Sequence, residues 1–159
     1  MTKKVTSLKE VKENQIKITK GELRNLILFS QPGIPNAYQK LINPVNPDKM
    51  SGKAKVKMMR LTMRLNPVLQ KIEEEREGIA KIFAVKDKKG EPKTKLNPQE
   101  TMVYDMGDKG KEFNEELSKL LKEDVEIPGE RIIIDAEDVP DNMLPYELEL
   151  LNKIINFKD

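Results

Sequence analysis

The sequence predicts a single α+β domain in which helices dominate, and three observations lead to this expectation. Residues 51–84 repeat apolar side chains at helical spacing, which predicts one long central helix. The same spacing recurs in residues 108–121 and 145–157, so two or three shorter helices should pack against the central one. Short runs rich in Ile and Val, such as residues 131–135, predict a small sheet of two or three strands.

Composition restricts the chemistry of this 159-residue chain, which has the length of one domain. It contains 29 Lys and Arg against 27 Asp and Glu, and eight Met but only seven aromatic residues, four Phe and three Tyr. The absence of Cys and His excludes disulfides, Ser-His-Asp triads, cysteine nucleophiles and the usual zinc sites. We therefore expect a non-enzymatic protein without a cofactor, and a carboxylate–metal hydrolase is the remaining enzymatic alternative.

Two regions are distinguished along the chain. Residues 1–14 are rich in Lys and predict a basic N-terminal arm, either a short helix or a frayed tail. Residues 15–157 predict the α+β domain, with exposed loops near residues 31–50 and 86–100. The first of these loops is rich in Pro and is either a structured connection or a binding segment.

The domain begins with an alternating stretch, residues 15–19, which predicts a strand. A helix over residues 20–29 should follow, because Thr19 and Glu22 have the spacing of a capping box. Within the Pro-rich loop, residues 37–42 are long enough for about one helical turn.

The central helix is defined by an apolar stripe that never changes phase. Its residues are Ala54, Met58, Leu61, Leu65, Leu69, Ile72, Ile79 and Phe83. Pro67 lies within this stripe, although proline lacks an amide hydrogen and costs roughly 3 kcal/mol inside a helix. We expect one helix kinked at Pro67; the alternative is two helices, the second capped by Asn66.

Weaker patterns follow the central helix. Residues 86–100 are polar and predict an exposed hairpin, with residues 101–106 as the returning strand. Residues 108–121 predict a helix that lies against the central one. Residues 125–127 and 131–135 predict two strands, one of which should pair with residues 15–19. The last helix should begin at Pro145 and end at Phe157.

The order of these parts resembles that of a loose group of small, mostly uncharacterised proteins encoded by tailed bacteriophages. The resemblance covers residues 15–157, and it is carried by Lys86, Asp87, Gly90 and Pro92 in a turn, by the block at residues 111–127, and by the leucines of residues 144–151. It implies a phage origin and an α+β layout. The Pro-rich residues 31–48, Pro67 and Leu144 depart from the pattern of the group.

A cationic stripe is the strongest candidate site. Lys53, Lys57, Arg60 and Arg64 follow one another at four, three and four residues, which places them along one side of the central helix. Such a face can neutralise the phosphates of a nucleic acid or bind an acidic partner. The alternatives are a solvated face and pairing with the acids of residues 112–123.

An acidic block occupies the second half of the same helix and contains Glu73, Glu74, Glu75 and Glu77. Acids late in a helix oppose the macrodipole, so the block predicts an acidic partner face that could pair with the basic half of a second copy. The alternative is local pairing, for example between Glu77 and Lys81. A further acidic cluster, Asp135, Glu137, Asp138 and Asp141, matches no calcium loop and more simply predicts an acidic loop that caps the last helix.

The expected function is that of a non-enzymatic bacteriophage protein which acts through protein contacts as a virion accessory or assembly subunit. Its partners would be other phage proteins or further copies of itself. The alternative is a small phage regulator or inhibitor that binds nucleic acid, or a host protein handling it, through the basic helix face. No membrane segment is apparent, so we expect the host cytoplasm as the location, with incorporation into the virion where the first function holds.

Overall fold

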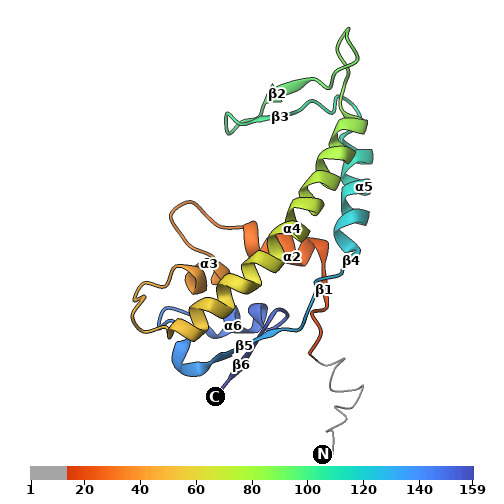
Figure 1. Ribbon diagram of the computed structural model, residues 1–159. Coiled ribbons are helices and arrows are strands. Elements are labelled where there is room, and N and C mark those ends of the chain that lie inside the picture. Colours follow the sequence, from red (N-terminus) through yellow and green to blue (C-terminus); the bar gives the residue numbers. More distant parts are fainter. Residues whose placement is uncertain (1–13) are drawn as a thin grey trace, which may run out of the picture.

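A computed structural model describes residues 14–159 and shows an elongated molecule, a body from which a two-helix stalk projects (Figure 1). The predicted basic arm, apart from Asn14, lies outside the described residues. The elements are β1 (Ile18–Thr19), α2 (Lys20–Leu28), α3 (Ala37–Ile42), α4 (Gly52–Phe83), β2 (Thr94–Leu96), β3 (Met102–Tyr104), α5 (Gly110–Lys122), β4 (Asp124–Val125), β5 (Ile132–Asp135), the 3₁₀ turn η1 (Ala136–Asp138), α6 (Pro145–Leu151) and β6 (Ile155–Lys158).

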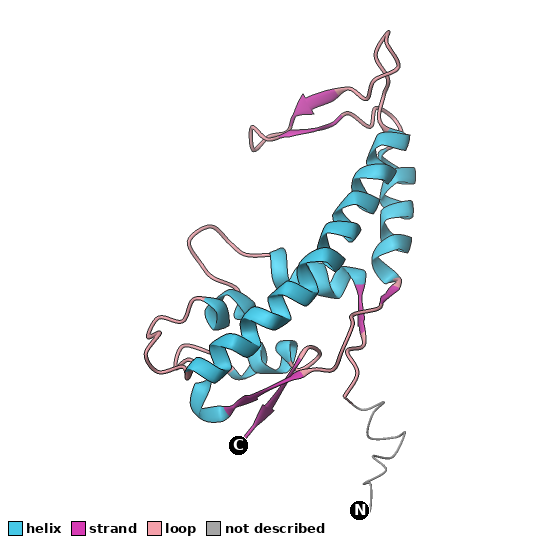
Figure 2. Ribbon diagram, viewed as in Figure 1, coloured by secondary structure: helices cyan, strands magenta, loops and turns pink. Residues whose placement is uncertain are grey.

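The predicted helix-dominated α+β class is confirmed (Figure 2). Among the described residues, the strands form three separate two-stranded sheets instead of one small sheet. β1 pairs with β4 and β2 pairs with β3, both antiparallel, whereas β5 and β6 are parallel. The expected partner of the first strand is confirmed, because Ile18 lies opposite Val125.

α4 is one helix of 32 residues that runs through Pro67. Its first turn is capped by Ser51, whose hydroxyl accepts the Ala54 amide at 3.1 Å. Leu65 and Leu69 are buried on either side of Pro67, which is itself exposed. Burial of one uninterrupted apolar stripe thus outweighs the hydrogen bond that proline removes, and the alternative of two helices capped at Asn66 is wrong.

In the body, α2, α3, α6 and the β5–β6 pair pack against one side of the first two-thirds of α4 (Figure 1). Along α4 the core begins at Ala54 and ends at Ile72. The predicted capping box of α2 is present: the Thr19 hydroxyl accepts the Glu22 amide at 3.2 Å, and the Glu22 carboxylate accepts the Thr19 amide at 3.0 Å.

The stalk consists of the last third of α4 and of α5, which runs beside it and returns the chain to β4 (Figure 1). Ala80, Ala84 and Leu120 are buried here, outside the core of the body. The predicted hairpin lies at the far end, where Thr94 of β2 faces Tyr104 of β3. Both the hairpin and the packing of α5 on α4 are therefore confirmed.

The C-terminal segment corrects one prediction. The last helix begins at Pro145 as expected, but it ends at Leu151, and residues 155–158 form β6 instead of continuing to Phe157 as helix. Ile155 lies opposite Ile132 of β5, and Ile154 and Ile155 are fully buried. The spacing from Leu151 to Ile155 fits a helix locally, but pairing with β5 satisfies the backbone and buries both isoleucines.

Candidate protein-binding face

The cationic stripe of α4 divides into two structural and two exposed side chains. The ammonium group of Lys57 donates to the carbonyl of Ile133 at 2.7 Å. The guanidinium of Arg64 donates to the carbonyls of Pro128 at 2.6 Å and Glu130 at 2.9 Å. These two cations therefore hold β5 and the turn that leads into it against α4, and the alternative that the stripe pairs with the acids of residues 112–123 does not apply to them.

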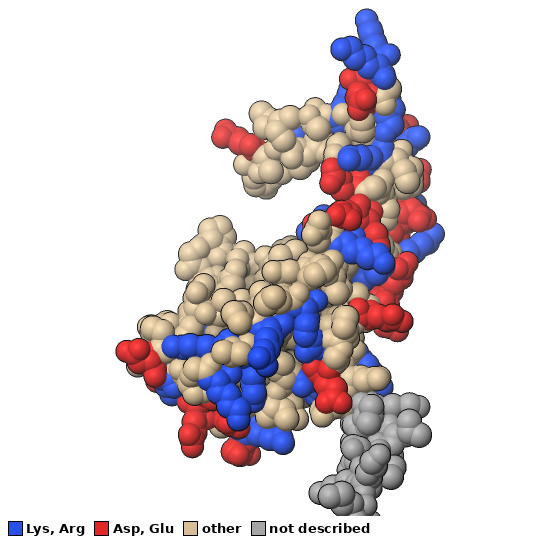
Figure 3. Space-filling view, viewed as in Figure 1, with Lys and Arg blue, Asp and Glu red and all other residues tan. Residues whose placement is uncertain are grey.

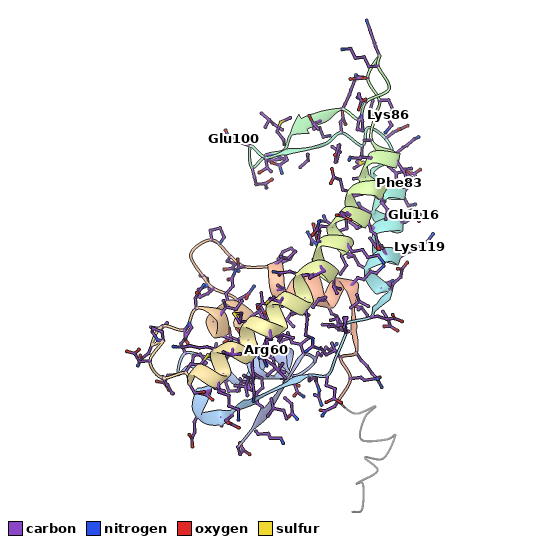
Figure 4. The ribbon with its side chains drawn as sticks, in the orientation of Figure 1. Arg60, Phe83, Lys86, Glu100, Glu116 and Lys119 are labelled. Atoms are coloured by element: carbon purple, nitrogen blue, oxygen red, sulfur yellow. The ribbon has the colours of Figure 1, made fainter. Side chains whose placement is uncertain are left out.

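Lys53 and Arg60 have a different environment. Both side chains are exposed, and neither forms a hydrogen bond or an ion pair with any residue of the described range 14–159. Arg60 comes from the middle of the first half of α4 (Figure 4). Lys55 lies on the other side of the part of α4 that faces solvent. It is also exposed and has no hydrogen-bond or ion-pair partner within this range.

Large apolar side chains lie between these cations. Met59 is 56% exposed and Met63 is 66% exposed, and Val56 of α4 and Ile42 of α3 are exposed beside them. Val56, Met59 and Met63 are spaced by three and four residues, so they form a second apolar stripe on the side of α4 that faces away from the core. We call Ile42, Val56, Met59 and Met63 the methionine face.

A pocket of about 270 Å³ opens into the methionine face between α3 and α4. Its walls are apolar except at two positions, and its lining residues are Leu41, Ile42, Met50, Lys55, Met58, Met59, Thr62 and Met63. The buried residues Leu41, Met50 and Met58 form its floor, because they belong to the core of the body. The pocket thus connects the outer surface of α4 to the core.

The α3 wall of this pocket is held by several side chains. Asn36 caps α3 by accepting the Gln39 amide at 2.8 Å. Tyr38 shares a hydrogen bond of 2.5 Å with the Thr62 hydroxyl of α4, and burial raises the pKa of this phenol. The ammonium group of Lys40 lies 2.9 Å from both carboxylate oxygens of Glu147 in α6. α3 is therefore fixed to α4 and α6.

Charge around the methionine face has one sign. Residues 49–72 contain seven Lys and Arg residues and no Asp or Glu. Figure 3 shows Lys and Arg side chains gathered on the body over the first half of α4, whereas acids and bases alternate on the stalk. An apolar surface with a positive border is the resulting arrangement.

The acidic block of α4 is used inside the molecule. Glu75 accepts from Lys20 at 2.7 Å, and Glu73 accepts from Arg24 at 2.6 Å, so α2 is tied to α4 by two ion pairs. Hydrogen bonds that Lys20 donates to Glu123 and Glu75 raise the pKa of Lys20 above its ordinary value. These contacts give an intramolecular reason for acids that oppose the helix macrodipole.

The other two acids of the block make local contacts. Glu77 accepts from Lys81 at 3.2 Å, as the local alternative predicted, and from the Tyr104 hydroxyl of β3 at 3.0 Å. The hydrogen bond from Lys81, followed by that from Tyr104, lowers the pKa of Glu77. Glu74 accepts from Gln70 at 3.1 Å. The four acids thus have partners within the chain.

The acids that follow β5 do not cap the last helix, and this prediction is corrected. The Asp138 carboxylate accepts the Ser51 amide at 2.7 Å, and Asp141 forms an ion pair with Lys49. They therefore bind the segment that begins α4, where the helix macrodipole favours negative charge. Within residues 14–159, no group of three acids has the geometry of a metal site.

A second groove, of about 570 Å³, lies between α2 and α6 and has the exposed side chains of Tyr146 and Leu150 on its border. Its charged border is mixed, because Glu22, Glu149 and Lys153 all line it. It provides an apolar surface without the single-sign border of the methionine face.

Comparison of the chain with protein-family models, with curated proteins and with solved structures found no match. Within the described range, no helix is both long and apolar enough to span a bilayer.

Sequence reasoning identified the cations of this site but not its apolar part. The signal was present, since Val56, Met59 and Met63 follow helical spacing opposite the buried stripe. The pocket beside them could not be read from the sequence, because it forms only where α3 packs against α4.

Proposed function

We propose that the chain is a non-enzymatic bacteriophage protein that acts by binding another protein through the methionine face, as a virion accessory or assembly subunit. The observation that supports this proposal is a contiguous apolar surface, open to solvent, with a pocket that reaches the core. Exposed apolar side chains gathered in this way are typical of protein-binding sites, whereas single exposed ones are ordinary.

Methionine is suited to such a role because its unbranched thioether side chain adapts to different partner shapes. The surface beneath Met59 and Met63 is fixed by buried residues and by the Tyr38–Thr62 hydrogen bond, so a partner would meet an adaptable layer on a rigid support. Little ordering of the backbone would then be needed on association, which lowers the entropic cost of binding.

The alternative, a regulator that binds nucleic acid through the basic stripe, has less support. Lys57 and Arg64 already donate to backbone carbonyls, which leaves Lys53 and Arg60 as the exposed cations of the predicted stripe. The surface of α4 beside them is apolar and contains no aromatic side chain for base stacking. A phosphate backbone would leave Met59 and Met63 without apolar contacts.

The proposal is tested in the phage that encodes the chain. Mass spectrometry of purified particles and of assembly intermediates should detect the wild-type protein, and Met59→Glu should remove it or reduce particle yield by about tenfold, since burying an unpaired carboxylate disrupts an apolar interface. Leu150→Glu is the matched control, because Leu150 is 55% exposed on the other apolar groove.

Absence of the wild-type protein from both fractions, together with a normal particle yield from the Met59→Glu phage, would refute the proposed role. If Met59→Glu and Leu150→Glu reduced particle yield equally, the methionine face would have no specific part in the proposed role. Light scattering of both purified variants should give the mass of intact protein, which separates lost contact from misfolding.

A further inference from the structure

We infer that the methionine face binds an acidic amphipathic segment of its partner protein and takes one large apolar side chain of that segment into the pocket between α3 and α4. This inference rests on the proposed function, because it names the chemistry of the partner that would occupy the same surface.

The sign of the partner follows from the cations around the face. Lys53 and Arg60 lie three and four residues from Val56 on one border, and Lys55 lies four residues from Met59 on the other. None of these three cations has an ion-pair partner within residues 14–159. Acidic side chains on both sides of an apolar stripe would therefore meet a cation on each border.

The size of the pocket indicates what enters it. At about 270 Å³ it is smaller than the cavities of roughly 300–1,000 Å³ that hold drug-sized ligands and cofactors. Its floor is made of Leu41, Met50 and Met58, with the Thr62 hydroxyl already engaged by Tyr38. One large aliphatic or aromatic side chain matches this volume and this lining.

The length of the face indicates how much of the partner it contacts. Val56 and Met63 are seven residues apart in the helix, which is a distance of about 10 Å along the axis at 1.5 Å per residue. A helical segment of two turns, with apolar side chains at positions i, i+3 or i+4, and i+7, covers that length. The segment would be short, which suits an adaptor contact between two phage proteins.

A second copy of this chain is a poor occupant. Two methionine faces brought together by a two-fold axis would place Lys53, Lys55 and Arg60 of one copy beside those of the other, and such like charges repel. The acids of α4 do not offer an alternative, because Glu73 and Glu75 are already bound to Arg24 and Lys20.

An anionic bilayer would meet the positive border but would leave the pocket unfilled, since a lipid surface is nearly flat on this scale. It would also find no Trp or Phe on the face to place at the lipid interface. The combination of concave apolar surface and positive border therefore favours a protein segment.

The test uses the full chain with labelled methionine methyl groups. Eight methionines give eight methyl signals, and their positions separate the face from the rest of the molecule. The probe is a synthetic 16-residue helical peptide with Leu or Phe at i, i+4 and i+7 and Glu at the remaining surface positions. Two control peptides are used. The first has the same composition in scrambled order, and the second has Lys in place of every Glu.

We expect the acidic peptide to shift the signals of Met59, Met63, Met58 and Met50. It should leave unchanged those of Met102 in the hairpin and Met106 just after it. Replacing Lys53, Lys55 and Arg60 by Gln should weaken binding by about tenfold, because two borders of charge pairing are lost. The matched control replaces Lys88, Lys89 and Lys93 by Gln, which makes the same charge change on the exposed hairpin end and should change affinity less than about twofold.

The inference is overturned if the acidic peptide leaves the signals of Met59 and Met63 unshifted, or if the scrambled or basic peptide binds equally well. It is also overturned if an oligonucleotide or anionic vesicles shift these two signals where the acidic peptide does not. The proposed function would survive such a failure wherever particles still contain the protein and Met59→Glu still removes it. Conversely, peptide binding without incorporation into particles would keep the inference and refute the virion role.

Discussion

Lys40 and Glu147 join α3 to α6 through an ion pair in which the lysine side chain is 12% exposed and the glutamate side chain only 8%. Both carboxylate oxygens accept from the ammonium group, and one also accepts the Leu144 amide at the start of α6. The same lysine donates to the carbonyl of Asn142 at 3.0 Å. The pair therefore fixes the helix that forms one wall of the pocket.

Removing the cation from this pair should strongly destabilise the protein. Lys40→Met leaves Glu147 buried without a positive partner, and we expect the free energy of unfolding to fall by about 3–5 kcal/mol in urea denaturation. Lys153→Met is the control, because its partner Glu22 is exposed and the loss should stay below about 1 kcal/mol. Equal effects of the two variants would contradict the burial of the Lys40 pair.

Two helical glycines should respond to alanine with opposite sign. A Cβ on Gly21 of α2 would lie 2.9 Å from the Leu121 carbonyl oxygen, whereas nothing lies within 4 Å of a Cβ on Gly78. We expect Gly21→Ala to lower the free energy of unfolding by about 1–3 kcal/mol, because α2 must move from α5. Gly78→Ala should raise it by about 0.5–1 kcal/mol. A stabilising Gly21→Ala would show that α2 and α5 are farther apart.

Arg64 and Arg60 belong to one stripe but should behave differently. Arg64→Leu breaks two hydrogen bonds to the Pro128–Glu130 turn and should lower the free energy of unfolding by about 1–2 kcal/mol. Arg60→Leu should change it by less than about 0.5 kcal/mol. Thermal unfolding of both variants measures this. A destabilising Arg60→Leu would place Arg60 among the structural cations.

Acid should weaken the fold through Glu22. The hydrogen bond from Lys153, followed by that from the Thr19 amide, lowers the pKa of Glu22 in the folded chain. The unfolded chain then binds the proton more readily, so the stabilisation is present above pH 4.5 and is lost as the pH falls through the folded pKa. Glu22→Gln should therefore flatten the decline of stability below pH 4.5.

Lys153→Ala provides the corresponding check, because it removes the main cause of that shift. It should flatten part of the same decline, and the double variant should show no more flattening than Glu22→Gln alone. If the two substitutions had additive effects on the decline of stability with falling pH, the pKa of Glu22 would not depend on Lys153.

Much of the fold could be predicted because its sequence signals lie within single elements. The stripe of α4 keeps its phase through Pro67, and the capping box of α2 lies within four residues, so both features are encoded by neighbours in the chain. The C-terminal strand was missed for a related reason. Between Leu151 and Ile155, helical spacing and a turn into a strand give the same local pattern, and only β5 decides between them.

The candidate site was only half predictable, because its remaining features depend on residues distant in sequence. Lys57 and Arg64 meet carbonyls 64 to 76 residues later in the chain, and no periodicity within α4 distinguishes them from Lys53 and Arg60. Glu73 and Glu75 likewise receive their cations from α2, which lies about fifty residues earlier. Charge pattern locates such side chains on a helix face but does not assign their partners.

The division of α4 between the core of the body and the stalk has a consequence for local opening of the molecule. The apolar side chains that α4 contributes to the core of the body end at Ile72, and the ion pairs of Glu73 and Glu75 with α2 follow within one turn. Beyond them, only small residues such as Ala80 are buried on α4. Amide protons before Ile72 should therefore exchange with solvent at the rate of global unfolding, and those near Ala80 should exchange faster. A single helix would then belong to two cooperative units, with the boundary between them inside one unbroken ladder of hydrogen bonds.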